Sequence, residues 1–425
     1  MVAARGLGPA FANLFTANLA SSLGDGIARV AMPLLAARLT NDPLLISGVA
    51  ALALLPWLFF AIPAGILIDR IDRRHALALA NGVRTLLAAL LFVLVVTESL
   101  TIWWLYLVIF VYGAFETVYD GAIRAVVPSI VARGNLSRAN SRIEGGELVV
   151  QNFLSGPFTS LLFAVSALIP LGVNAIVYAG ALLLAFLLPK AASGGQFAAA
   201  GEPPARWRGQ FSDGYRFIMR NPMLRRLWFF STFMGIAGTA ATASFVLFVL
   251  DRLGVPEAWF GFFMLSGAVG GIVGSVIAGR LKTRWGAGLV MASMNVVISV
   301  SFFAIGAVPN VGVAAVGFAL SSGAITVWNI HVMSLRQSLI PGHLLGRVHG
   351  TWRTLLWGAM PLGALAGGLL GRIDLTAPFL VGGGVSVVAS AVFFRFLTTL
   401  PDPEDVDNGD GPVGPIEPPG ITPVQ

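Results

Sequence analysis

Cysteine is absent from the sequence, which excludes disulfide bonds and thiolate metal sites. Charged residues are scarce: they make up 11% of the 425 residues, whereas an average soluble domain contains about 25%. The four histidines, His75, His331, His343 and His349, are scattered, and none has the spacing of a metal ligand. We therefore expect neither a metal nor another cofactor.

The sequence also lacks the short motifs on which several functions depend. It has no Gly-x-x-x-x-Gly-Lys-Ser/Thr phosphate loop, so ATP-driven transport is not indicated. It has no evident nucleophile–base pair, so we expect no catalytic residues, and it has no large sensing domain. A membrane enzyme or receptor is therefore kept only as the alternative to a transporter. The net charge of +7 does not indicate nucleic-acid binding, because the basic residues lie between hydrophobic segments, where membrane topology requires them.

Long hydrophobic segments are abundant. Hydrophobic residues make up 56% of the chain, and the mean hydropathy is +0.82. Because a bilayer crossing needs about 20 mostly apolar residues, the sequence predicts an all-α polytopic protein of the lipid bilayer, with twelve transmembrane helices in two six-helix bundles. The predicted helices cover residues 11–37, 44–68, 76–97, 101–128, 137–164, 168–188, 223–250, 257–281, 287–308, 311–339, 345–370 and 376–397.

Arginine placement predicts the orientation of these helices. One set of alternate connections contains most of the basic residues, and the opposite set contains only Arg38, Arg252 and Arg372. The positive-inside rule places the rich set, and with it both termini, on the cytoplasmic side of a bacterial-type inner membrane. The predicted parts of the chain are an N-terminal half (1–188), a cytoplasmic linker with an amphipathic helix (189–222), a C-terminal half (223–398) and a disordered cytoplasmic tail (399–425).

The two halves repeat weakly. Ala64–Arg70 matches Ala278–Arg284 at an offset of 214 residues. Arg124 followed by Pro128 is repeated at offsets of 212 and 213 residues, in Arg336 and Pro341. Such a parallel duplication of six helices is an arrangement known from secondary transporters.

The segment GILIDRIDRR at Gly65–Arg74 resembles the loop 2–3 signature of the major facilitator superfamily. Asp72 replaces the second glycine of that signature. This replacement resembles the variant of the drug:proton antiporter-3 branch, which includes macrolide and siderophore exporters. Other segments that resemble this branch are Ser22–Gly26, Leu136–Asn140, Arg336–Pro341 and Leu345–Val348. The resemblance implies a monomer that works by alternating access. It also implies a conformational latch formed by Gly65, Asp69, Arg70, Arg73 and Arg74.

The sequence departs from the antiporter pattern at two places. In the predicted helix 137–164, Gly156-Pro157 are kept, but Thr159-Ser160 stand where further glycine is expected. The arginine motif of helix 4 in many proton antiporters is not recognisable in 101–128.

Acidic residues within the predicted spans lie only in the first half. Insertion scales give a cost of roughly 2.5–3.5 kcal/mol for each such group, so each is a functional candidate. Asp25 is the leading candidate for proton transfer, with Arg29 as its predicted partner. The full predicted set for proton coupling is Asp25, Arg29, Glu116, Asp120, Arg124, Glu144 and Glu147. The alternative is that the acids of 101–128 and 137–164 form a static ion network with Arg124 and Arg142 that closes the cytoplasmic gate.

Aromatic, methionine and amide side chains suggest where a substrate binds, because they form adaptable apolar surfaces. The predicted cavity residues are Asn18, Tyr112, Gln151, Phe233, Trp328, Asn329, His331, Trp357 and Met360. We expect a secondary active transporter that exports amphipathic small molecules, such as drugs or siderophores, in exchange for protons. Proton-coupled uptake of a nutrient is the alternative within transport, since the sequence does not determine direction.

Overall fold

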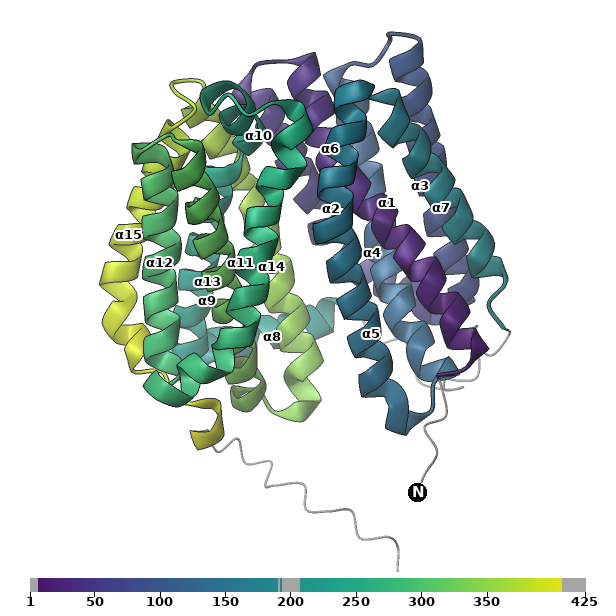
Figure 1. Cartoon of the computed structure of the whole chain (residues 1–425). Coiled ribbons are helices and arrows are strands. Elements are labelled where there is room, and N and C mark those ends of the chain that lie inside the picture. Colours follow the sequence, from purple (N-terminus) through teal and green to yellow (C-terminus); the bar gives the residue numbers. More distant parts are fainter. Residues whose placement is uncertain (1–6, 190–191, 193–206, 407–425) are drawn as a thin grey trace, which may run out of the picture.

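The computed structural model describes residues 7–189, 192 and 207–406, and every regular element in these ranges is a helix (Figure 1). The first half contains α1 (Pro9–Leu39), α2 (Pro43–Arg70), α3 (Arg73–Val96), α4 (Ile102–Ile130), η1 (Arg133–Asn135), α5 (Leu136–Leu148), η2 (Val149–Leu154), α6 (Ser155–Val165) and α7 (Leu168–Phe186). The second half contains α8 (Trp207–Arg220), α9 (Pro222–Thr242), α10 (Phe245–Leu247), η4 (Phe248–Arg252), α11 (Glu257–Trp285), α12 (Ala287–Ala307), α13 (Val311–Leu339), α14 (Gly342–Gly371), α15 (Ala377–Thr398) and η5 (Pro403–Asp405).

Most of these helices are long and apolar enough to cross a membrane. Ten meet this condition within the described residues, and an eleventh span results if the bent pair Pro222–Thr242 and Phe245–Arg252 is one crossing. The 31-residue α1 is not among them, since Asn18, Asp25 and Arg29 lie within it. All twelve predicted segments coincide with helices, so the all-helical fold is confirmed, while the exact count of twelve spans is not.

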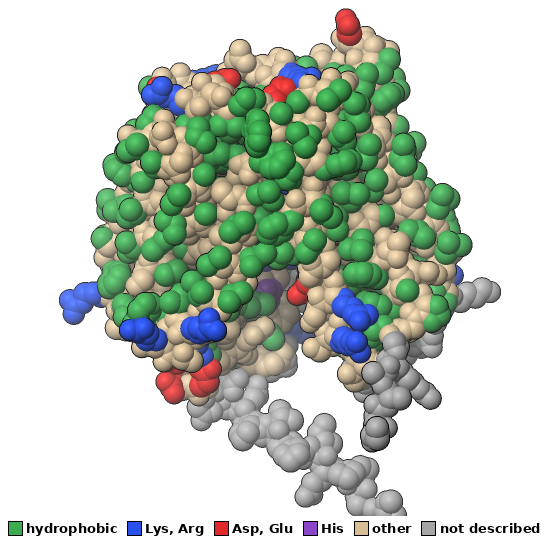
Figure 2. Space-filling view, in the orientation of Figure 1, with side chains coloured by type: hydrophobic (Ala, Val, Ile, Leu, Met, Phe, Trp, Pro, Cys, Tyr) green, Lys and Arg blue, Asp and Glu red, His purple; other side chains and the backbone are tan. Residues whose placement is uncertain are grey.

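The helices form two bundles, α1–α7 and α9–α15, which lie side by side in Figure 1. The bundles meet where α2 packs against α14 and where α6 packs against α11. Figure 2 shows hydrophobic side chains over a broad middle band and charged side chains toward the two ends, as a hydrocarbon environment requires. We call the end at the bottom of Figure 1, where α1 begins, the lower face, and the opposite end the upper face.

Polar side chains cap several helices where the chain enters the apolar band. Asp42 accepts a hydrogen bond from the amide of Leu44 at the start of α2, and Asp72 accepts one from the amide of Arg74 at the start of α3. Asn310 caps α13 in the same way. Each cap satisfies an amide that has no partner within its own helix.

Two of the predicted spans are not continuous α-helices. The span predicted at 137–164 consists of α5, the π-helical segment Val149–Leu154 and α6. The span predicted at 223–250 is bent by 42° between α9 and the segment Phe245–Arg252. A π turn rotates the residues that follow it around the helix axis, so it changes which side chains face the neighbouring helices.

The ends of the C-terminal bundle include segments outside the spans. The helix α8 packs against α14 and α9, and the Thr351 hydroxyl donates a hydrogen bond to the carbonyl of Phe211 at 3.3 Å. Asp402 accepts a hydrogen bond of 2.6 Å from the amide of Ala287, so the first residues of the predicted tail pack against the bundle. The remaining parts of the predicted linker and tail, 190–191, 193–206 and 407–425, lie outside the described residues.

Candidate functional site

Two adjoining cavities lie between the bundles. The lower one, which we call the vestibule, has a volume of about 470 Å³ and includes Gln337 and His349 near the lower ends of α13 and α14. The upper one, which we call the central cavity, has a volume of about 590 Å³ and extends past Asp25 to Phe245. Their sizes fall within the range for small-molecule sites.

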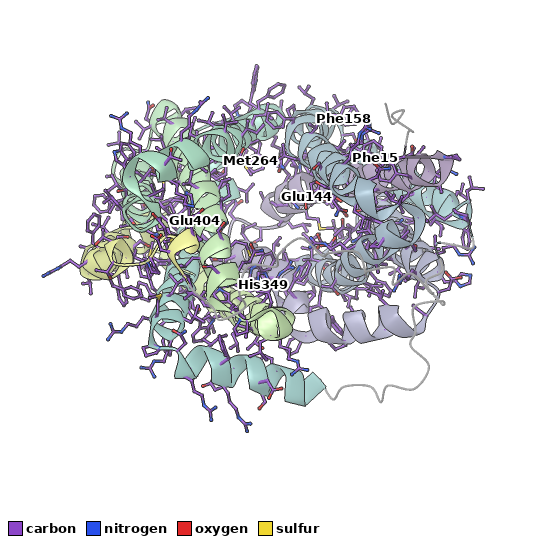
Figure 3. All side chains as sticks on the ribbon, turned by 90° about the horizontal axis from the view of Figure 1, so that it is seen from below. Phe15, Glu144, Phe158, Met264, His349 and Glu404 are labelled. Atoms are coloured by element: carbon purple, nitrogen blue, oxygen red, sulfur yellow. The ribbon has the colours of Figure 1, made fainter. Side chains whose placement is uncertain are left out.

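The lower face is open and the upper face is closed. Figure 2 shows the lower face hollowed between the two halves. Seen from below in Figure 3, Glu144, Met264 and His349 border the opening. At the upper face, Arg38 on α1 pairs with Glu257 on α11 at 2.5 Å, and Arg372 at the end of α14 pairs with Asp42 at 2.5 Å. Both ion pairs join one half to the other.

Backbone packing accompanies these ion pairs on the upper side. A Cβ on Gly261 of α11 would lie 1.9 Å from the carbonyl oxygen of Gly156 on α6, and one on Gly368 of α14 would lie 2.0 Å from the Ser47 hydroxyl of α2. Ser160, which stands where glycine was expected, accepts a hydrogen bond from the Gly261 amide at 2.9 Å. Only glycine permits approaches this close, so the backbones of α6 and α11 touch directly, and the backbone of α14 lies against the Ser47 side chain of α2.

The two predicted latch residues whose side chains are described, Arg73 and Arg74, form hydrogen bonds within the N-terminal half. The Arg73 guanidinium donates to the Ala125 carbonyl at 2.8 Å. Arg74 pairs with Asp72 at 2.6 Å and, as a hydrogen-bond donor, holds the pKa of the Asp72 carboxyl below its ordinary value. The side chains of the other three latch positions lie outside the described residues, namely those of Gly65, Asp69 and Arg70.

Asp25 is the centre of a buried polar cluster. Its partner is Arg84 of α3, whose guanidinium lies 3.2 Å from the carboxylate and is fully buried. The hydroxyls of Tyr112 and Tyr178 lie 2.5 and 2.7 Å from the same carboxylate oxygen and within hydrogen-bonding distance of each other. Because each hydroxyl has one hydrogen, the two hydroxyls together supply two hydrogen bonds to these three contacts. The predicted partner, Arg29, is instead exposed and donates to Gln151 at 3.4 Å. The prediction of an Asp25–Arg29 pair was therefore wrong.

Aromatic rings enclose Arg84. Its guanidinium carbon lies 5.0–5.6 Å from the ring centres of Tyr112, Tyr119 and Tyr178, a cation–π geometry. Gly24 makes room for this arrangement, because a Cβ there would lie 2.5 Å from the Tyr178 ring. A buried guanidinium is tolerated only with such compensation, so the cluster depends on every member.

A hydrogen-bonded chain connects this cluster with α5. The Tyr119 hydroxyl donates to the Asn18 amide oxygen at 3.1 Å, and the Asn18 amide donates to Glu147 at 2.8 Å. Asp25 and Glu147 both line the central cavity. Tyr119 touches the cluster through its ring contact with Arg84, so the hydrogen-bonded chain links Glu147 to that ring contact and not directly to the Asp25 carboxylate.

The predicted stripe on α4 faces the cavities along its whole length. Tyr112 and Glu116 line the central cavity, Asp120 lines both cavities, and Arg124 lines the vestibule. Glu116 and Asp120 form no hydrogen bond or ion pair with another described side chain. The static network with Arg124 and Arg142 is thus not formed in this conformation, and Glu144 is exposed.

The C-terminal half contributes a mainly apolar wall. The charged residue that this half contributes to the central cavity is Arg353 of α14, which lies against the rings of Trp57 and Trp357. The four carboxylates of this cavity, Asp25, Glu116, Asp120 and Glu147, all come from the N-terminal half. The cavity is therefore acidic on one side and aromatic and apolar on the other.

The other predicted substrate residues of the C-terminal half do not line either cavity. Trp328 packs against Phe230 with ring centres 5.8 Å apart, and His331 is buried. Phe233 and Asn329 are exposed away from both cavities, and Met360 lies against Gly235 of α9. The vestibule residues of α13 are Met333 and Gln337.

Sequence reasoning missed Arg84, Tyr178, Trp57 and Arg353. The first had an available signal, since an arginine in the middle of the predicted span 76–97 is as costly as the acids that were singled out. Arg353 carried the same signal, because it lies as far inside the predicted span 345–370 as Arg84 lies inside 76–97. Trp57 and Tyr178 carried none, because aromatic residues are common in spans.

Comparison with known proteins agrees with this architecture. Residues 7–412 match a protein family described as transmembrane secretion effector. The chain is 26% identical over 401 residues to the multidrug efflux pump Tap of Mycobacterium tuberculosis, covering 88% of this chain and 90% of that protein. It is 21% identical over 388 residues to macrolide efflux protein A of Streptococcus pyogenes, covering 90% and 94%. It is 24% identical over 355 residues to the enterobactin exporter EntS of Escherichia coli, covering 81% of each.

Solved structures show the same fold. The nucleoside transporter NupG superposes with a TM-score of 0.70 at 16% identity, covering 92% of this chain and 100% of that one. A bacterial homologue of the iron transporter ferroportin, in an inward-facing state, gives a TM-score of 0.69 at 17% identity, covering 93% and 100%. Two helix bundles around a shared cavity define a multi-pass membrane transporter of the major facilitator class. Within that class, the chain belongs to the transmembrane secretion effector family.

Proposed function

We propose that this protein exports amphipathic small molecules by alternating access and that protons moving inward drive the export. The observation that carries this proposal is the central cavity, which is sealed at the upper face and is acidic on its N-terminal side only. Relatives that export macrolides, several drugs and enterobactin support the direction and the chemical class.

The lower face is then the cytoplasmic side of a bacterial-type inner membrane, because the arginine-rich connections lie there and positive residues stay inside. Both termini are cytoplasmic in this orientation, and the conformation described is open to the cytoplasm. In the opposite state, the latch of Gly65, Asp69, Arg70, Arg73 and Arg74 would hold the lower ends of the two halves together. One chain contains a complete cavity, which supports a functional monomer.

The proton route in this proposal begins at the carboxylates that have no fixed partner. Glu116 and Asp120 face the cavity without an ion pair, so they can exchange protons with water that enters from the lower face. Asp25 is different, since protonating it would leave Arg84 as an unpaired buried cation. Proton uptake at Asp25 must therefore accompany a rearrangement of α1 against α3, and this requirement would couple protonation to the change of state.

The test uses purified protein in liposomes with a pH-sensitive dye in the lumen. Wild-type protein is compared with Asp25→Asn, Asp120→Asn and the control Glu98→Gln, an exposed acid in the loop between α3 and α4. A macrolide, a catecholate siderophore and a lipophilic dye are each added on one side. We expect at least one of them to move protons in the opposite direction in wild type and Glu98→Gln, and the movement to be lost in Asp25→Asn.

Two results would count against the proposal. Transport without proton movement would remove the antiport step, and proton movement in the same direction as the compound would favour the uptake alternative. Binding of the compound to Asp25→Asn, measured in detergent, separates a loss of coupling from a loss of folding. An Asp25→Asn protein that still exchanges protons for the compound would make the buried cluster a structural element.

A further inference from the structure

Three side chains from both halves meet where the vestibule adjoins the central cavity. Trp57 of α2 and Trp357 of α14 have ring centres 5.4 Å apart, at an interplanar angle of 60°. The guanidinium carbon of Arg353 lies 4.2 Å from the Trp57 ring centre and 4.8 Å from that of Trp357. All three residues line both cavities, so a molecule that moves from one to the other passes this cluster.

Arg353 differs from Arg84, which aromatic rings also enclose. Arg84 is fully buried and pairs with Asp25 at 3.2 Å. Arg353 is partly exposed to the cavities and has no hydrogen bond or ion pair with another described residue. Its two tryptophan contacts are therefore what holds it, and a guanidinium held this way can leave without breaking an ion pair.

The cavities offer the displaced guanidinium a new partner. Asp120 lines both cavities together with Arg353, and it has no ion-pair partner among the described residues. Exchange of the tryptophan contacts for an ion pair with Asp120 would keep Arg353 compensated. The aromatic surface that Arg353 covers on the two rings would then be free for another positive group.

The helices that carry the tryptophans each have a proline close to the ring. Pro361 of α14 has no amide hydrogen to donate to the carbonyl of Trp357, four residues earlier. Pro56 precedes Trp57 directly within α2. Each proline removes one backbone hydrogen bond from a continuous helix, which makes the helix easier to deform beside the ring when a ligand binds.

We infer that Trp57 and Trp357 form a binding site for a weakly hydrated organic cation, and that Arg353 occupies this site until the cation displaces it. The inference rests on the proposed transport function, because it assumes that the substrate passes through the cavity. It adds a chemical class, a molecule with a diffuse positive charge, and a specific position. The site spans both halves, so its occupation reports directly on their relative arrangement.

The test is equilibrium dialysis of the purified full-length protein with tetraphenylphosphonium and with tetraphenylborate, which has the same shape and the opposite charge. Each of these variants removes one cation–π contact, so we expect Trp57→Leu and Trp357→Leu each to weaken phosphonium binding by at least about tenfold. Trp57→Phe retains the aromatic face and should retain most of the affinity. Trp103→Leu, at an exposed position on α4 away from both cavities, is the matched control.

Arg353→Met gives the decisive comparison. If Arg353 competes with the ligand, its removal strengthens phosphonium binding, and the gain disappears when Trp57→Leu is added. Weaker binding in Arg353→Met, equal losses for tetraphenylborate, or an equal loss in Trp103→Leu would each overturn the site. Equilibrium dialysis measures binding without a proton gradient, so its result does not depend on transport. If the protein shows the expected binding pattern but transports none of the compounds, the proposed function is contradicted and the binding site is not.

Discussion

The N-terminal bundle places an arginine–aspartate pair at its centre, whereas the C-terminal bundle places neutral groups between α12 and α15, and its buried arginine, Arg336, contacts His349 instead of a carboxylate. Asp25 and Arg84 join α1 to α3, and three tyrosines surround them. Between α12 and α15, the hydroxyls of Ser299 and Ser390 share a hydrogen bond of 3.0 Å. Asn295 donates to a carbonyl of its own helix. The helix α12 carries no charged residue at all.

This difference separates two tasks within one repeated architecture. A buried ion pair is sensitive to the loss of either partner, so its bundle can respond to a proton. The groups between α12 and α15 are neutral and locally satisfied and have no such response, which suits a rigid, mostly apolar wall. If this interpretation is correct, equivalent changes in the two halves should have unequal effects.

The largest effect is expected for Arg84→Met. Removing the guanidinium leaves the Asp25 carboxylate buried without its cation, which costs about 3–5 kcal/mol of folding stability. The thermal midpoint of the detergent-purified protein should fall strongly, and Arg84→Lys should not restore it, because an ammonium does not match the planar stacking between the tyrosines.

The double variant Asp25→Asn with Arg84→Met is the control for this prediction. It removes both charges, so it should be more stable than Arg84→Met alone. A double variant that is no better than the single one would mean that Arg84 acts through packing alone.

A matched pair of glycines gives the next largest difference. A Cβ at Gly24 would lie 2.5 Å from the Tyr178 ring, whereas one at Gly238 of α9 would lie 3.6 Å from Phe302, an ordinary contact. Gly24→Ala should therefore destabilise the protein by about 1–3 kcal/mol through overpacking. Gly238→Ala should be neutral or stabilise it by up to about 1 kcal/mol, because alanine favours the helix. Equal thermal midpoints for the two variants would contradict the comparison.

The sequence predicted the fold and the family correctly because both leave local signals. Lipid requires long apolar segments, and the loop signature at Gly65–Arg74 is contiguous. The α4 stripe was also visible, since residues four apart share one face of a helix. These features need no knowledge of how one helix is placed against another.

The missed features depend on the rotation and register of separate helices. The faces of α13 are an example: Trp328 and His331 belong to its buried side, while Met333 and Gln337 face the vestibule. Residue types alone favoured the wrong side. The Asp25–Arg84 pair and the Trp57–Arg353 contact likewise join helices whose relative position no local pattern encodes.

A smaller effect is expected in the C-terminal bundle from Ser299→Ala. The Ser299 hydroxyl is buried, donates to the Asn295 carbonyl at 2.7 Å and contacts Ser390. Its loss should cost about 1 kcal/mol, the usual value for a neutral hydrogen bond. The thermal midpoint should fall slightly, and proton-coupled transport should be unchanged. A loss of coupling in this variant would show that the C-terminal half also takes part in proton transfer.

The smallest effect is expected where the halves meet, at the exposed pair of Asp42 and Arg372. The Arg372 guanidinium, as a hydrogen-bond donor, holds the pKa of the Asp42 carboxyl below its ordinary value while the upper face is closed. A lowered pKa means that the pair stabilises closure fully above the ordinary value of about 3.9 and loses its effect as the pH falls through the lowered value.

Spin labels can be placed at Asn41→Cys and Ile373→Cys without interference, because the chain has no other cysteine. Their distance should stay constant from pH 7 to 5 and lengthen only in stronger acid, whereas Asp42→Asn should remove this acid response. A transition near pH 6 would instead place the control of closure in the buried groups of the N-terminal bundle and would make the exposed pair irrelevant to it.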